Sequence, residues 1–107
     1  MPAGWFTALV HGPSMVPTLR HGDAVLVRRL ADPARVRVGD VVVARFAARP
    51  GALFVKRVAR RDGAGWWVLG DNPLVTDDSR AYGAAEVVGR VVLRWWPRPG
   101  RMRRRVR

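Results

Sequence analysis

The stretch LFVKRVARRDGAGWWVL, residues 53–69, decides the fold. Two runs rich in Val, Phe and Trp flank Asp62–Gly65, whose Asp and Gly residues are typical of a tight turn. This pattern predicts a β-hairpin. Side chains alternate along a strand, so Phe54, Lys56 and Val58 are expected on one face. Because its two neighbours on that face are apolar, Lys56 is predicted to point inward.

Runs of the same type recur along the chain, separated by Gly, Pro and Asp, and helix signals are nearly absent. The expected strands are residues 5–10, 24–29, 41–46, 53–61, 66–69 and 87–96. At 107 residues with 49% apolar residues, the chain can bury one modest core. The sequence therefore predicts an all-β, mostly antiparallel domain over residues 1–97.

Lys56 is the single lysine among twenty basic residues. Arginine stays charged at any ordinary pH, whereas a desolvated lysine can lose its proton and serve as a base. No acidic residue lies between Asp40 and Asp62 in the chain, which favours a lowered pKa for Lys56. The alternative is a lysine that extends from a half-buried strand into solvent.

Ser14 follows the first expected strand, in a loop where Pro13 and Pro17 restrict the backbone on either side. A serine in such a loop is usually only a turn residue. A serine beside a neutral lysine can, however, act as a nucleophile with its base, and the chain holds no usable Ser/His/Asp trio. Ser14 and Lys56 are therefore the candidate catalytic residues.

Four segments together resemble the boxes of the type I signal peptidase family. They are the serine box at 12–23, a Gly-Asp-hydrophobic strand at 38–43, the lysine box at 55–58 and the last box at 70–83. They stand in the family's order and cover roughly residues 8–94. The resemblance implies a small β-domain of the signal-peptidase and LexA-like kind. It also implies a serine endopeptidase that needs no cofactor and cleaves a precursor protein or peptide.

By this resemblance Ser14 is the nucleophile and Lys56 the general base, and the Ser14 amide holds the oxyanion. Thr76 falls where the family often has a serine that hydrogen-bonds the lysine, and a threonine can supply the same hydroxyl. The other implied residues are Gly12, Pro13 and Met15 at the oxyanion and substrate region, and Asp78, Ser79 and Arg80 as structural support. Gly12 replaces a serine donor found in some members, which leaves the second oxyanion donor open.

Metal binding has little support in the sequence. His11 and His21 are the only histidines, and there is no cysteine. We therefore expect neither a metal nor a cofactor.

Charge is concentrated at the C-terminus. The net charge is +12, and six arginines lie within residues 98–107. Basic ends of this kind are usually disordered and attract the phosphates of nucleic acid or anionic lipid. We expect a disordered tail over 98–107 with weak anionic membrane contact. Trp95 and Trp96 are either the end of a core strand or an interfacial anchor.

No apolar run approaches the roughly 18–20 residues that span a bilayer, and the first ten residues lack signal-peptide features. Signal peptidases carry an anchor ahead of the serine, yet thirteen residues precede Ser14. Either residues are missing ahead of Met1 or the substrate is in solution. We expect a cytoplasmic protein, or else a peripheral membrane protein.

Within the family, the arginine-rich, anchor-poor form with residues 66–73 most resembles the actinobacterial nickel-type superoxide dismutase maturation proteases. That resemblance implies removal of a leader from the dismutase precursor.

Three rival interpretations stay open. The first is a general signal peptidase docked on the membrane by Trp95, Trp96 and the basic tail. The second is a self-cleaving repressor, although Ala3-Gly4 lies only ten residues before Ser14 and leaves no room for a DNA-binding domain. The third is a basic β-barrel that binds nucleic acid. It does not explain the order of the boxes, so we expect no specific nucleic-acid partner.

Overall fold

A computed structural model describes residues 4–32 and 35–105. Its elements are β1 (Trp5–Leu9), β2 (Ala24–Arg29), β3 (Val41–Phe46), β4 (Phe54–Asp62), β5 (Gly65–Leu69), α1 (Ser79–Tyr82), β6 (Ala85–Trp96) and β7 (Gly100–Arg101). The described strands form one antiparallel sheet in the order β1-β2-β6-β3-β4-β5, with β7 added to β6.

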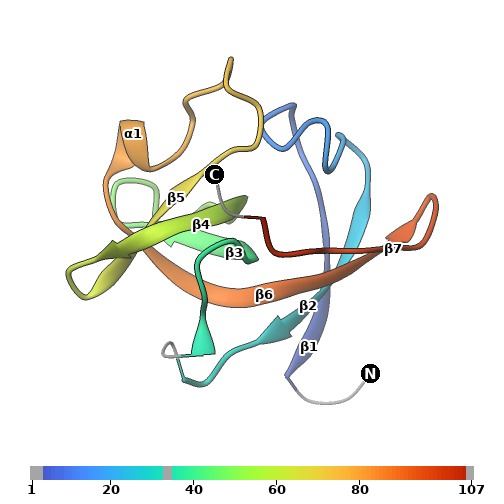
Figure 1. The fold of residues 1–107 in the computed structure, drawn as a ribbon, viewed down its shortest axis with the longest axis horizontal. Coiled ribbons are helices and arrows are strands. Elements are labelled where there is room, and N and C mark those ends of the chain that lie inside the picture. The colour runs from blue at the N-terminus through green and yellow to red at the C-terminus, as the bar shows by residue number, and fades with distance from the viewer. Residues whose placement is uncertain (1–3, 33–34, 106–107) are drawn as a thin grey trace.

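The long strand β6 closes this sheet into a small barrel. Its first half pairs with β3 and, at Trp66 opposite Ala85, with β5, whereas its second half pairs with β2. Figure 1 shows β6 curving across the molecule among these partners. Register shifts in the β2–β6, β3–β6 and β4–β5 pairs mark bulges, which bend and twist strands at such corners.

Two hydrophobic clusters fill the interior, one on each face of β3. Val42 and Ala44 point into the first cluster, and Val41 and Val43 point into the second, as the alternation of a strand requires. The first cluster also contains Phe46, Val58, Trp66, Val68 and Val87. The second contains Val10, Met15, Leu19, Val25, Val27 and Val91. Met15 and Leu19 belong to the loop around Ser14, so the second cluster anchors that loop.

The all-β, antiparallel fold expected from the sequence is confirmed. The predicted hairpin is also present, with Asp62 opposite Gly65 at its closed end. The ends of several strands differ by one or two residues from the expected ranges. Two short elements, α1 and β7, were not predicted, because each is too short to leave a periodic pattern.

The segment expected to be a disordered tail instead packs on the barrel over residues 98–105. β7 pairs with β6, and Met102 packs against the second cluster. The Arg103 carbonyl accepts a hydrogen bond from Arg57 Nη1 at 3.0 Å, and the Arg105 amide donates to Gly39 O at 3.1 Å. The sequence argument counted the arginines as solvated charges, whereas Arg104 and Arg105 form ion pairs with the buried carboxylates of Asp40 and Asp71. Residues 106–107 lie outside the described ranges.

Deleting residues 103–107 should lower the free energy of unfolding by about 1–3 kcal/mol, since the buried Arg57 guanidinium loses an acceptor. The deletion also removes the Arg104–Asp40 ion pair of 2.7 Å. Urea denaturation would measure the change. A chain that ends at Arg105 keeps every one of these contacts and serves as the control. Equal stability of the two truncated chains would show that these contacts contribute nothing.

Candidate active site

The loop that carries Ser14 leaves β1 and returns to β2. The ladder continues past both strands, with Val10 N donating to Asp23 O and Gly22 N to Val10 O, each at 2.8 Å. The side chains of Met15 and Leu19 are buried in the second cluster and anchor the loop to the core. Ser14 lies half-buried between these fixed points. Its backbone is therefore set by packing as well as by the neighbouring prolines.

The remaining residues of the serine box have mainly conformational roles. Gly12 has a φ of 78°, which favours glycine, and its amide donates to His21 Nδ1 at 3.0 Å. That bond occupies His21, and the His11 ring lies edge-on to it with 5.6 Å between ring centroids. Among the described residues, no group of three His, Asp or Glu side chains could hold a metal. Pro13 is exposed.

The segment after β5 lies directly against the Ser14 loop, where Figure 1 shows the two loops side by side. Asn72 N donates to Ser14 O at 2.8 Å, and Asn72 Nδ2 donates to Pro13 O at 3.1 Å. A Cβ atom at Gly70 would lie 2.5 Å from Ser14 O. Any larger residue at position 70 would thus displace the backbone of Ser14.

The Lys56 side chain is buried in the interior of the domain, as predicted. It is 1% exposed, and it stands opposite Val42 in the β3–β4 ladder. Its Nζ lies 5.7 Å from the centre of the Phe54 ring. Burial lowers the pKa of Lys56 from its ordinary value, while the charges of Asp77 and Asp78 raise it in part and that of Arg80 lowers it again.

The two carboxylates near Lys56 were missed by the sequence argument. That argument considered only acidic residues close in the chain, whereas Asp77 and Asp78 approach from the segment before α1. Their effect is smaller than that of burial, so the pKa of Lys56 is still lowered.

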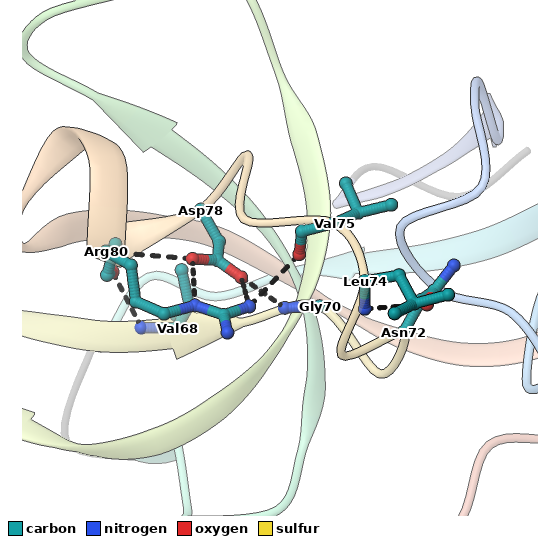
Figure 2. Close-up of polar contacts among 8 residues, drawn as sticks. Val68, Gly70, Asn72, Leu74, Val75, Asp78 and Arg80 are labelled. Carbon is teal, nitrogen blue, oxygen red and sulfur yellow. Dashed lines mark hydrogen bonds and ion pairs between the residues drawn. The ribbon is translucent and has the colours of Figure 1, made fainter.

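Asp78 accepts several of the hydrogen bonds that hold this segment in place, as Figure 2 shows. Its side chain is fully buried, and its Oδ2 accepts from Gly70 N at 2.9 Å and Arg80 Nη2 at 2.7 Å. Its Oδ1 accepts from Arg80 N at 3.1 Å, which caps α1. Arg80 Nη2 also donates to Val75 O, and Ser79 Oγ accepts from Val68 N at 2.8 Å. The last box therefore fastens α1 to β5.

Burial alone would raise the pKa of Asp78, but the hydrogen bonds from Arg80 and Gly70 outweigh it and the pKa is lowered. Asp78 is therefore charged near neutral pH, and its role as structural support of a catalytic site stays a prediction. Thr76 is exposed on the same segment. Its role in orienting Lys56 stays a prediction.

The buried ion pair Arg57–Asp71 was not predicted. Arg57 Nε donates to Asp71 Oδ1 and Arg57 Nη2 to Asp71 Oδ2, each at 2.8 Å. Thr18 Oγ1 donates to Asp71 Oδ2 at 2.5 Å. Burial alone would raise the pKa of Asp71, but these hydrogen bonds and the nearby arginine charges lower it. The pair joins the serine loop to the strand that carries Lys56.

These contacts place one segment, residues 70–78, near both candidate residues. Residues 70–72 hold Ser14, and Asp77 and Asp78 lie near Lys56. Gly70 links the serine loop to Asp78, because its Cα faces Ser14 and its amide donates to Asp78 Oδ2.

The stability of the domain should depend on pH through Lys56. Burial lowers the pKa of Lys56 in the folded state, whereas the unfolded chain keeps a value near 10.5. Between these two values the unfolded state binds more protons, so the free energy of unfolding should rise with pH. Lys56→Met removes this titration and should flatten the curve there. Urea denaturation across that range compares the two chains, and parallel curves would contradict the lowered pKa.

Known proteins resemble this chain over most of its length. The family model described as Peptidase S24-like matches residues 2–92. The chain belongs to the Peptidase S24-like family. It is a signal-peptidase-like protease. In the described ranges, no helix has the length and apolar character needed to cross a membrane.

Three relatives illustrate this membership. The mitochondrial ATP-independent inner membrane protease subunit 1a of Arabidopsis thaliana is 30% identical over 118 residues, covering 85% of this chain and 70% of the relative. The mitochondrial inner membrane protease subunit 1 of Xenopus tropicalis is 32% identical and that of Homo sapiens 28%, each over 110 residues. These two alignments cover 80% of this chain but 66% of each relative.

Proposed function

We propose that the chain is a serine endopeptidase in which Ser14 is the nucleophile and Lys56 the general base. One observation supports this most directly: the buried Lys56, with its lowered pKa, lies near the segment that also holds Ser14. A lysine must be neutral to accept a proton, and burial makes the neutral amine available at a lower pH than in water. Membership of a peptidase family supports the same chemistry.

In the proposed reaction, Ser14 Oγ attacks the substrate carbonyl carbon as its proton moves to Lys56 Nζ. The Ser14 amide donates to the oxyanion that forms. The C–N bond then breaks, and the leaving amine takes the proton from Lys56, which leaves an ester on Ser14. Water gives a proton to Lys56 as it attacks the ester, and that proton returns to Ser14 Oγ as the acid product leaves. No metal or cofactor takes part.

Thr76 is proposed to orient the Lys56 amine, because it directly precedes Asp77 and Asp78, whose charges act on Lys56. Gly12, Pro13 and Met15 are proposed to shape the oxyanion and substrate region around Ser14. Asp78, Ser79 and Arg80 hold the segment in place through their hydrogen bonds to Gly70, Val75 and Val68.

The proposed substrate is a precursor with an N-terminal leader, specifically the precursor of a nickel-type superoxide dismutase, cleaved in the cytoplasm. The resemblance of residues 66–73 to the maturation proteases supports this choice. The second candidate is a signal peptidase that cleaves secretory precursors at a membrane. The names of the relatives, which are inner membrane proteases, favour that candidate.

Incubating the purified chain with a nickel-dismutase precursor and with a secretory precursor would separate the two candidates. Each mixture is run with and without anionic vesicles, and the new N-termini are sequenced. We expect cleavage of the dismutase precursor alone, without vesicles, and none by the Ser14→Ala chain. Cleavage of only the secretory precursor would establish the second candidate. If neither substrate is cleaved under any condition, both substrate assignments are wrong.

A further inference from the structure

A basic pocket lies at the opposite end of β2 from the serine loop. The loop enters β2 at Ala24, whereas the pocket opens beside Arg28 and Arg29. Its volume is about 710 Å³. The arginines that line it are Arg28, Arg29, Arg35, Arg37, Arg90 and Arg104, and the acidic residue Asp32 lines it as well. They come from β2, from the segment between β2 and β3, from β6 and from the C-terminal segment, so distant parts of the chain gather positive charge at one place.

The sheet register places two of these charges directly opposite each other. Arg28 on β2 pairs with Arg90 on β6, and both side chains line the pocket. Like charges directly opposite in an antiparallel pair are destabilising. Arg28 lies 5.7 Å from the centre of the Trp5 ring, and Arg90 is half-buried. Within the described residues, neither forms an ion pair with a carboxylate.

Elsewhere on β6, an acidic residue rather than an arginine stands opposite an arginine of the neighbouring strand. Arg45 on β3 stands opposite Glu86, which pairs unlike charges across the ladder. The Arg28–Arg90 pair therefore does not follow from a general excess of arginine along β6.

Neighbouring contacts leave donors available at the pocket. Arg104 Nε is bound to Asp40 Oδ1 at 2.7 Å, which fixes the guanidinium while its terminal nitrogens are not used in that bond. The Arg37 amide is bound to the same carboxylate, through Oδ2. Asp40 thus holds two of the lining residues at the pocket wall.

From this geometry we infer that the pocket binds a phosphate group. Guanidinium forks match the oxygens of phosphate and form strong, charge-assisted hydrogen bonds with them. A bound dianion between Arg28 and Arg90 would convert their repulsion into attraction. The phosphate can belong to a free phosphate compound or to a lipid headgroup, which present the same oxygens. This site is independent of the proposed cleavage reaction.

Calorimetric titration with pyrophosphate at constant ionic strength tests the site on the full-length chain. Saturable binding is expected for the native protein. Arg28→Gln and Arg90→Gln should each weaken it by about ten- to a hundredfold, because each removes charge-assisted hydrogen bonds. Arg45→Gln is the matched control and should leave the affinity unchanged. Sedimentation with phosphatidylglycerol and phosphatidylcholine vesicles then separates the two sources of phosphate.

A second readout distinguishes a binding site from a chance cluster. Without phosphate, Arg90→Gln should raise the urea midpoint, since it relieves the repulsion, whereas Arg45→Gln should lower it. Binding of phosphatidylglycerol vesicles that requires Arg90 would identify a lipid headgroup, and binding of pyrophosphate alone would identify a soluble ligand. Native affinity in Arg90→Gln, or no saturable binding of either probe, would overturn the inference. Binding only to a single-stranded oligonucleotide would overturn it as well.

Discussion

Lys56→Arg is expected to abolish peptide cleavage. Arginine keeps its proton at any pH at which the protein is folded, so it cannot accept the proton of Ser14. General-base catalysis contributes roughly 10²- to 10⁴-fold, and loss of one member of a catalytic pair commonly removes most of the activity. Ser14→Ala should be equally inactive, because no oxygen is left to form the ester. Mass spectrometry of precursor cleavage would measure both.

The control must separate lost chemistry from lost folding, because Lys56 is buried and arginine is larger. Lys56→Met has a similar length and no charge, so it should fold with native stability or better at neutral pH and still be inactive. Thr76→Val should slow cleavage less than Lys56→Met does, since its proposed role is to orient the amine. Near-native activity of Lys56→Arg would show that Lys56 is not the base.

The all-β, antiparallel fold could be predicted from the sequence because its signals are local. The turn at Asp62–Gly65 and the alternation around Lys56 depend on residues next to one another, and the structure places both as expected. The burial of Lys56 followed from its apolar neighbours on one strand face. The closure of the barrel by β6 did not follow, because it depends on which strands pair, and strand pairing is not encoded locally.

The candidate site was predicted in part, mainly through family resemblance. The sequence argument expected residues 70–83 to belong to the candidate site. It did not predict that the backbone of Gly70 lies against Ser14 while its amide donates to Asp78. The contact between Gly70 and Ser14 joins segments more than fifty residues apart, and composition carries no signal for it. The C-terminal arginines were misjudged for the same reason, since the carboxylates that attract them lie at Asp40 and Asp71.

Arg57→Ala should be among the most destabilising single substitutions in the chain. The Asp71 side chain is fully buried, and removing Arg57 leaves a buried carboxylate without its bidentate partner. Breaking such a pair costs about 3–5 kcal/mol, a large share of the 5–15 kcal/mol that stabilises a typical domain. Urea denaturation at neutral pH would measure the loss. Cleavage should fall too, because Asp71 also binds Thr18 in the serine loop.

Arg60→Ala on the same strand is the matched control. Arg60 and Asp62 form an exposed pair 3.8 Å apart, with 57% and 42% of their side chains accessible, and such pairs contribute about 0–1 kcal/mol. Acid provides a further check. The pKa of Asp71 is lowered in the folded state, so its contribution to stability is present above the ordinary value of 3.8 and is lost as the pH falls through the folded value. The difference between native protein and Arg57→Ala should therefore shrink in acid. If Arg57→Ala is no more destabilising than Arg60→Ala, the buried pair does not hold the serine loop to β4, and the loop depends on its other contacts, the packing of Met15 and Leu19 and the hydrogen bonds from Asn72.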